Sequence, residues 1–101
     1  MLTSERFSVP KIFEQDVLRA VNILREAGCS GVYLFGSVLE GNVRDDSDLD
    51  LAIRGCPSGR FYHLIGQLLL ELEHPVDLVN LDTQDPFAHQ LQKEGMLVQV
   101  G

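Results

Sequence analysis

Apolar and polar residues follow two different periods along this chain, and the period separates helices from strands. Between residues 12 and 27, apolar side chains recur every three or four positions, and Gly28 follows as an expected helix end. A stronger apolar stripe over residues 61–72 predicts a second helix, with Ser58 as its cap. It has to end before Pro75, because the residue preceding a proline is pushed out of helical geometry. A weaker pattern predicts a helix over residues 86–93.

Four other segments predict strands, at residues 31–35, 48–53, 76–81 and 96–100. The segment 48–53 alternates strictly, which puts Leu49, Leu51 and Ile53 on one face and Asp48 and Asp50 on the other. With the helices, the order is α-β-β-α-β-α-β. This order predicts an α/β (α+β) fold in which helices pack on a small mixed sheet of about four strands.

The size of the chain fits one compact unit. It has 101 residues, of which 45% are hydrophobic and 23% charged, and it shows no repeat or linker. We therefore expect a single domain over residues 1–101. No apolar run approaches the roughly 18 to 20 residues needed to cross a bilayer, and the first residues lack a signal pattern. The sequence predicts a cytoplasmic protein with no membrane contact.

The cysteines and histidines show no metal-binding spacing. Cys29 and Cys56 lie far apart in sequence, and in a reducing compartment they are expected to be free thiols. His63, His74 and His89 form neither HxH nor HExxH patterns, so we expect them at the surface or at helix ends.

The charge of the chain constrains its partners. The formal net charge is −7, from 15 acidic and 8 basic residues, and the basic residues are scattered. Nucleic acid would be repelled on average, because binding it depends on clustered cations that release counterions. A ligand that bears phosphate needs a metal cation or a local positive patch, and a basic partner protein is favoured.

The stretch LFGSVLEGNVRDDSDLDLAI, residues 34–53, combines two glycines with a dense acidic group. Gly36 and Gly41 have the spacing of a Walker phosphate loop, but Asn42 and Val43 stand where that loop needs a lysine and a hydroxyl. An EF-hand that began at Asp46 would have leucine in place of its turn glycine and proline in place of its bidentate glutamate. Both sites are therefore excluded.

Asp48 and Asp50 remain as the chemically informative pair. Two ionised carboxylates about 5 Å apart repel by roughly 3 kcal/mol at an effective dielectric near 20, and a bound divalent cation would offset that repulsion. Asp77, isolated in the apolar segment 76–81, adds a third carboxylate if its strand lies beside the first. From spacing alone, Asp77 could equally face solvent on an edge strand.

The glycine-serine pair, the DxD pair and the later aspartate together resemble the minimal nucleotidyltransferases of the DNA polymerase β superfamily. The segment 93–98 also resembles the usual ending of that family. The matching segments are Phe35-Gly36-Ser37, Ser47-Asp48-Leu49-Asp50-Leu51 and Val76-Asp77-Leu78.

The resemblance implies a mixed sheet with packed helices and a Mg²⁺-dependent transfer of AMP from ATP to an acceptor hydroxyl. It implies that Gly36 and Ser37, with Ser47, bind the nucleotide, and that Asp48 and Asp50 ligate two Mg²⁺ ions. It also implies that Asp77 completes the catalytic metal site and helps to deprotonate the acceptor. Many stand-alone members of this size resemble antitoxins that add AMP to a tyrosine of an all-helical HEPN-type toxin. We therefore expect such a toxin as partner, and a homo- or hetero-oligomer.

The sequence departs from the family after the glycine-serine pair. Members usually continue with arginines, as in GSRARG, whereas this chain has Val38, Leu39 and Glu40. An acid replaces a base where triphosphate charge should be neutralised, which is expected to weaken nucleotide binding. Two hypotheses follow. The protein is either an adenylyltransferase acting on a partner, or a catalytically weak or inactive module that neutralises a partner by contact.

Overall fold

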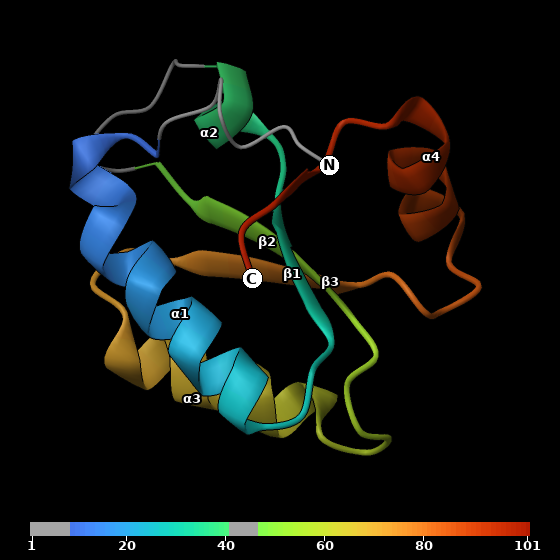
Figure 1. The fold of residues 1–101 in the computed structure, drawn as a ribbon, viewed down its shortest axis with the longest axis horizontal. Coiled ribbons are helices and arrows are strands. Elements are labelled where there is room, and N and C mark those ends of the chain that lie inside the picture. Colours follow the sequence, from blue (N-terminus) through green and yellow to red (C-terminus); the bar gives the residue numbers. More distant parts are fainter. Residues whose placement is uncertain (1–8, 41–46) are drawn as a thin grey trace.

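The structure is a computed structural model, and it describes residues 9–40 and 47–101. Four strands form one sheet in the order β3-β2-β1-β4 (Figure 1). The central pair is β1 (Gly31–Leu34) and β2 (Leu49–Arg54), which run antiparallel. Strand β3 (Val76–Asn80) lies parallel to β2, and the short β4 (Val98–Gln99) lies antiparallel to β1. The predicted mixed sheet of four strands is confirmed.

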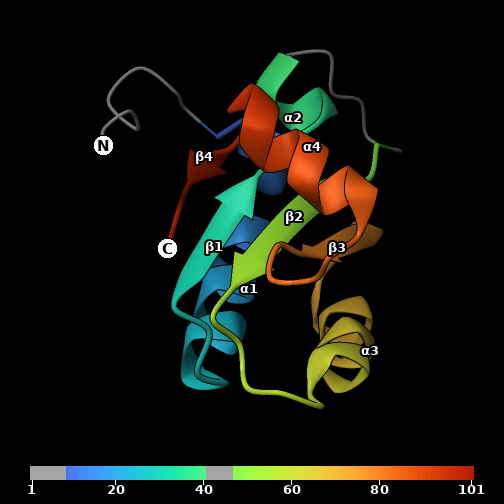
Figure 2. The same cartoon turned by 90° about the vertical axis from the view of Figure 1, so that its right-hand side faces the viewer.

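The helices cover both faces of this sheet. The 3-10 turn η1 (Lys11–Phe13) leads into α1 (Glu14–Glu26), which lies beside α3 (Phe61–Glu71) on one face. Helix α4 (Pro86–Glu94) covers the other face (Figures 1 and 2). A four-residue helix, α2 (Ser37–Glu40), directly follows the turn after β1.

Some element boundaries differ from the sequence predictions. Strand β2 begins at Leu49, so Asp48 lies just outside it, and α2 occupies positions where no helix was predicted. Ser58 is not the cap of α3, because that helix follows Arg60 and no side chain caps it. Helix α4 extends one residue beyond the predicted range 86–93, to Glu94, and Gly95 ends it in the left-handed conformation with φ 68°.

The alternation in β2 divides the core in two. Leu49, Leu51 and Ile53 are fully buried and pack in a cluster with residues of α1 and α3. Ala52 points the other way and packs with Ala88 of α4. Burying each large aliphatic side chain contributes about 1.5 to 3 kcal/mol. This pattern therefore fixes which residues of β2 face α4, and Asp50 is among them.

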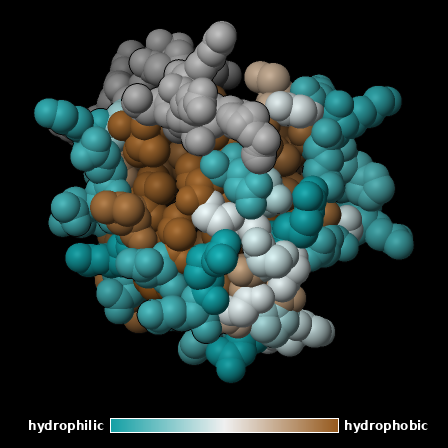
Figure 3. All heavy atoms as spheres, in the orientation of Figure 1, coloured by the Kyte–Doolittle hydropathy of each residue, from teal (hydrophilic) through white to brown (hydrophobic). Residues whose placement is uncertain are grey.

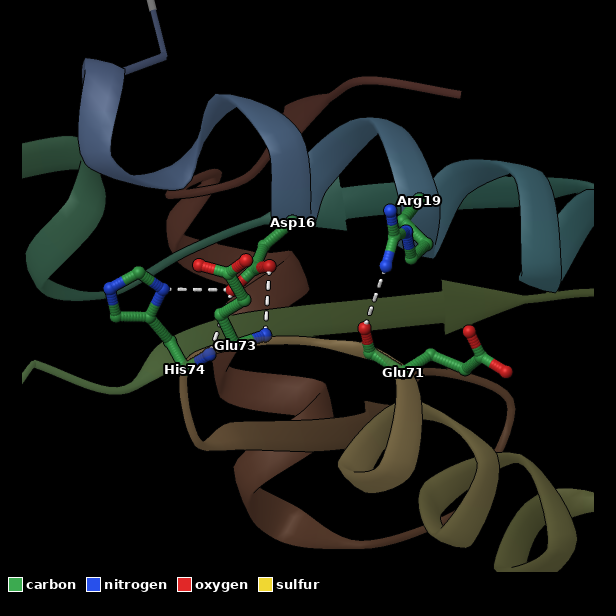
Figure 4. Close-up of polar contacts among 5 residues, drawn as sticks. All are labelled: Asp16, Arg19, Glu71, Glu73 and His74. Atoms are coloured by element: carbon green, nitrogen blue, oxygen red, sulfur yellow. Dashed lines mark hydrogen bonds and ion pairs between the residues drawn. The ribbon is translucent and has the colours of Figure 1, made fainter.

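A buried aspartate ties α1 to the turn that precedes β3 (Figure 4). The carboxylate of Asp16 accepts hydrogen bonds from the backbone N–H groups of Glu73 and His74, each at 2.9 Å, and lies 2.8 Å from Nδ1 of His74. Nearby, the guanidinium of Arg19 donates to the carbonyl of Glu71 at 3.2 Å. These contacts fix the chain just before it enters β3.

Cys29 and Cys56 form a disulfide. The expectation of free thiols was therefore wrong. The two residues are 27 positions apart in sequence, but antiparallel pairing of β1 with β2 brings the start of one strand beside the end of the other. Sequence separation hid this proximity, because it depends on strand pairing. In addition, none of the helices in the described part of the chain is long and apolar enough to span a membrane.

Candidate active site

The turn after β1 places bare backbone against an acidic side chain. Gly36 has a φ of 79°, a conformation that side-chain-bearing residues rarely adopt. A methyl group added to its Cα would overlap the carboxylate of Asp50 and lie 3.0 Å from Asp50 Cγ. The N–H of Phe35 also donates to the carbonyl of Asp50 at 3.2 Å. Only glycine allows this close approach between the turn and β2.

Asp50 and Asp77 are direct neighbours across the parallel pair β2 and β3. Residues in register on adjacent parallel strands point to the same face, and the strands lie about 4.8 Å apart. That face is the one covered by α4, because Leu49, Leu51 and Leu78 all belong to the cluster on the opposite face. The sheet therefore brings these two predicted site residues together.

The question left open for Asp77 is resolved by its place in the sheet. Strand β3 is an outer strand, and the side chain of Asp77 is exposed. It is thus an edge-strand acid and also a neighbour of the half-buried Asp50. Because Asp77 is exposed, a ligand or partner can reach it. Its position on an outer strand still leaves it next to Asp50.

The remaining predicted residues lie around this pair. Asp48 directly precedes β2 and is exposed, and Ser47 is half-buried. The side chains of Ser37 and Glu40 lie outside the described structure, as do residues 41–46. Within residues 9–40 and 47–101, no three His, Cys, Asp or Glu side chains form a ready-made metal site. An all-carboxylate oxygen donor set nonetheless suits Mg²⁺, which prefers oxygen ligands.

The residues that replace the family's arginines are partly explained by packing. Val38 is only 1% exposed and belongs to the core on the α1 side. Leu39 is half-buried and packs against both core clusters. These two side chains stabilise α2 against the sheet, so an arginine at Val38 would have to displace core packing.

Asp16 is a supporting residue that sequence reasoning missed. Burial alone would raise its pKa, but the hydrogen bonds from Glu73 and His74 outweigh burial and lower the pKa of Asp16 below its usual value. The sequence does indicate that Asp16 is buried. Asp16 precedes Ala20 by four positions on the buried stripe of α1, where a carboxylate needs partners.

Comparison with known protein families identifies the family of this chain. The sequence profile of the family described as "Polymerase beta, Nucleotidyltransferase" matches residues 20–99. The chain belongs to this nucleotidyltransferase family. The match spans the Gly36 turn, β2 and β3, so the resemblance expected from the motif residues is confirmed. No curated protein matches the sequence significantly.

Solved structures show the same fold for this nucleotidyltransferase. A toxin-antitoxin structure with AMP-PNP is 25% identical, with a TM-score of 0.64 over 85% of this chain and 70% of that one. A doubly substituted mutant of the toxin-antitoxin MntA-HpeT is 23% identical, with a TM-score of 0.64 over 81% of this chain and 69% of that one. The toxin-antitoxin MntA-HepT is 22% identical, with a TM-score of 0.60 over 85% and 69%.

Proposed function

We propose that this nucleotidyltransferase transfers AMP from ATP to the hydroxyl of a partner protein, and that it requires Mg²⁺. The observation that carries the proposal is the registered pair Asp50 and Asp77, which share one face of the sheet beside the Gly36 turn. Two carboxylates at this separation would bind a divalent cation strongly. Carboxylate oxygens are ligands of the kind that Mg²⁺ prefers.

In the proposed reaction, the acceptor hydroxyl attacks the α-phosphorus of ATP. The new bond joins the acceptor oxygen to phosphorus, and the bond to pyrophosphate breaks. Gly36 and Ser37, with Ser47, would hold the triphosphate, and Asp77 would take the proton from the acceptor hydroxyl. Asp48, Asp50 and Asp77 would hold up to two Mg²⁺ ions, whose charge would neutralise phosphate oxygens in the transition state.

We further propose that the partner is an all-helical HEPN-type toxin and that the modified hydroxyl belongs to one of its tyrosines. Support comes from the solved relatives, which are toxin-antitoxin structures, one of them with the ATP analogue AMP-PNP. The MntA-HpeT mutant carries two Asp-to-Glu changes separated by one residue. Asp48 and Asp50 have the same spacing.

Labelling with α-³²P-ATP tests the chemistry. The wild-type protein, Mg²⁺ and the protein encoded by the neighbouring gene should give a labelled partner, and Asp50→Asn and Asp77→Asn should each reduce the rate at least 100-fold. Glu73→Gln is the matched control, because Glu73 is exposed and contributes only its backbone N–H to the contacts described. Unchanged labelling in Asp50→Asn would refute the assigned role of this residue.

A second candidate is an antitoxin that acts by contact alone. It is favoured by the apolar residues at positions 38 and 39, of which Val38 is buried in the core and supplies no charge for a triphosphate. Neutralisation of the toxin separates the two candidates. If a variant with alanine at Asp48, Asp50 and Asp77 still neutralises the toxin fully, contact is sufficient and the enzymatic proposal fails as an account of neutralisation.

A further inference from the structure

Helix α3 presents a second apolar face to the outside of the molecule. Tyr62 is 83% exposed, Leu69 55% and Leu70 87%. With Gly66 they occupy neighbouring positions on the helix surface, at spacings of three and four residues. They are three of the seven exposed large hydrophobic side chains in residues 9–40 and 47–101. The outward α3 face is defined here as Tyr62, Gly66, Leu69 and Leu70.

The fold does not need this face. Leu64 and Leu68, on the opposite side of α3, are fully buried and make the contacts with the core. One apolar stripe is sufficient for a helix that packs on a sheet, and the other face is normally polar. Exposed apolar side chains that gather on one element mark interaction sites. The outward α3 face therefore requires an explanation outside the folding of this chain.

Gly66 supports the same conclusion. Glycine in a helix interior is destabilising relative to alanine, and it is usually kept where another backbone approaches closely. Within this chain, a methyl group added at Gly66 would meet nothing within 4 Å. Around Gly66 lies a shallow hollow of about 450 Å³, lined also by Tyr62, His63, Gln67 and Leu70. The space is suited to a side chain or helix from another molecule.

The outward α3 face continues toward the proposed active site. Tyr62 also lines a second hollow of about 390 Å³, together with Val79 and Asp85. Val79 lies in β3, the outer strand that carries Asp77 two positions earlier. A partner seated on α3 would therefore contact the strand from which Asp77 projects.

Charge indicates what kind of partner fits. Glu71 ends α3 and Asp85 borders the second hollow, in a chain of net charge −7. A second copy would bring the same acids against themselves, which disfavours self-association. We propose that the outward α3 face docks an apolar helix face flanked by basic residues, supplied by the partner protein. Identifying that partner as the HEPN-type toxin rests on the proposed function.

Another apolar area provides a matched control. Val9, Val17 and Leu18 line a hollow of about 350 Å³ on α1, and apolar side chains gather over this part of the molecule in Figure 3. Leu18 is 64% exposed, comparable to the leucines of α3. The change Leu18→Glu therefore introduces the same charge at another exposed apolar position, on α1 instead of α3.

The test measures binding of the chain to the neighbouring gene's product by calorimetry, without ATP or Mg²⁺. Leu70→Glu should weaken binding at least 100-fold, and Gly66→Leu, which fills the hollow without adding charge, at least 10-fold. Leu18→Glu should change it less than threefold. Urea unfolding of each free variant verifies that it is folded. Both changed α3 positions are away from the core, so the unfolding midpoints should stay close to that of the wild type.

Three outcomes would overturn the docking surface. These are wild-type protein that does not bind the gene product, equal effects of Leu18→Glu and Leu70→Glu, and sedimentation showing a wild-type dimer that Leu70→Glu converts to monomer. The last would assign the face to a second copy. Failure of the proposed function can be distinguished from failure of the docking surface. If the partner is never labelled but Leu70→Glu still abolishes binding, the docking surface stands and the transferase assignment falls.

Discussion

At the scale of single residues, the candidate site depends on one position that lacks a side chain. Gly36 combines a positive φ with direct proximity to Asp50, so two separate physical reasons require glycine there. Gly59 has a similar φ of 82° but open space around its Cα. Alanine substitutions at Gly36 and Gly59 therefore separate the effect of backbone strain from the effect of a clash with the Asp50 carboxylate.

Gly36→Ala should reduce nucleotide transfer at least 100-fold, because its methyl group has to displace the Asp50 carboxylate. It should also destabilise the fold by about 1 to 2 kcal/mol through backbone strain. Gly59→Ala should cost similar stability and leave transfer unchanged. Urea midpoints and labelling rates of both variants measure the two effects. Equal losses of transfer would show that strain alone is responsible.

Asp16 gives a prediction about pH. Its pKa is lowered in the folded state, so its ionised form stabilises the fold above the ordinary aspartate pKa, and this contribution is lost as the pH falls through the lowered value. Asp16→Asn should destabilise by about 1 to 3 kcal/mol at pH 7, because its amide group faces a backbone N–H. The gap between wild type and variant should shrink below pH 4.

Urea unfolding from pH 7 to pH 2 measures that gap. Glu73→Gln serves as the control, since Asp16 contacts only the backbone of Glu73. A gap that is constant across this range would contradict the proposed ionic contribution.

At the scale of elements, the helices and strands with a continuous apolar face were predicted from the sequence. The stripe through Leu64 and Leu68 located α3, and the alternation through Leu49 and Leu51 located β2. Helix α2 was missed because four residues are too few for a helical period to show. The start of β2 was placed one residue early, because Asp48 continues the alternation without joining the ladder.

The disulfide is a second feature that local patterns could not reveal. Closing a loop of this length restricts the unfolded chain, so Cys29→Ser should lower the free energy of unfolding by about 3 kcal/mol under oxidising conditions. The loss should vanish when both proteins are measured with excess reductant. Thiol titration of the native wild-type protein gives an independent measurement. Two reactive thiols in the absence of reductant would contradict the pairing.

At the scale of the whole molecule, net charge affects how ATP binds. A chain of charge −7 repels a free triphosphate, so ATP should bind more weakly without a divalent cation than with one. Calorimetric titration should show ATP affinity at least 10-fold weaker in EDTA than in excess Mg²⁺. Asp50→Asn should narrow this difference, and Glu73→Gln should not. Equal affinities with and without Mg²⁺ would contradict the cation-dependent site.

Topology also explains how far the candidate site was predictable. The DxD pair and Asp77 were identified from isolated acids in apolar segments, but their mutual position required the strand order. Parallel pairing of β2 with β3 places Asp77 beside Asp50, and no local pattern specifies that partner. The partners of Asp16 were hidden for the same reason, because they lie 57 and 58 positions away in sequence.

The outer position of β3 has a thermal consequence. A peripheral strand opens locally at lower cost than a central one, so fraying of β3 would carry Asp77 away while the rest of the sheet stays intact. The buried carboxylate on α1 holds the entrance to that strand. Its hydrogen bonds oppose that local opening, so their loss should let the acid pair separate at a temperature below the point at which the whole chain melts.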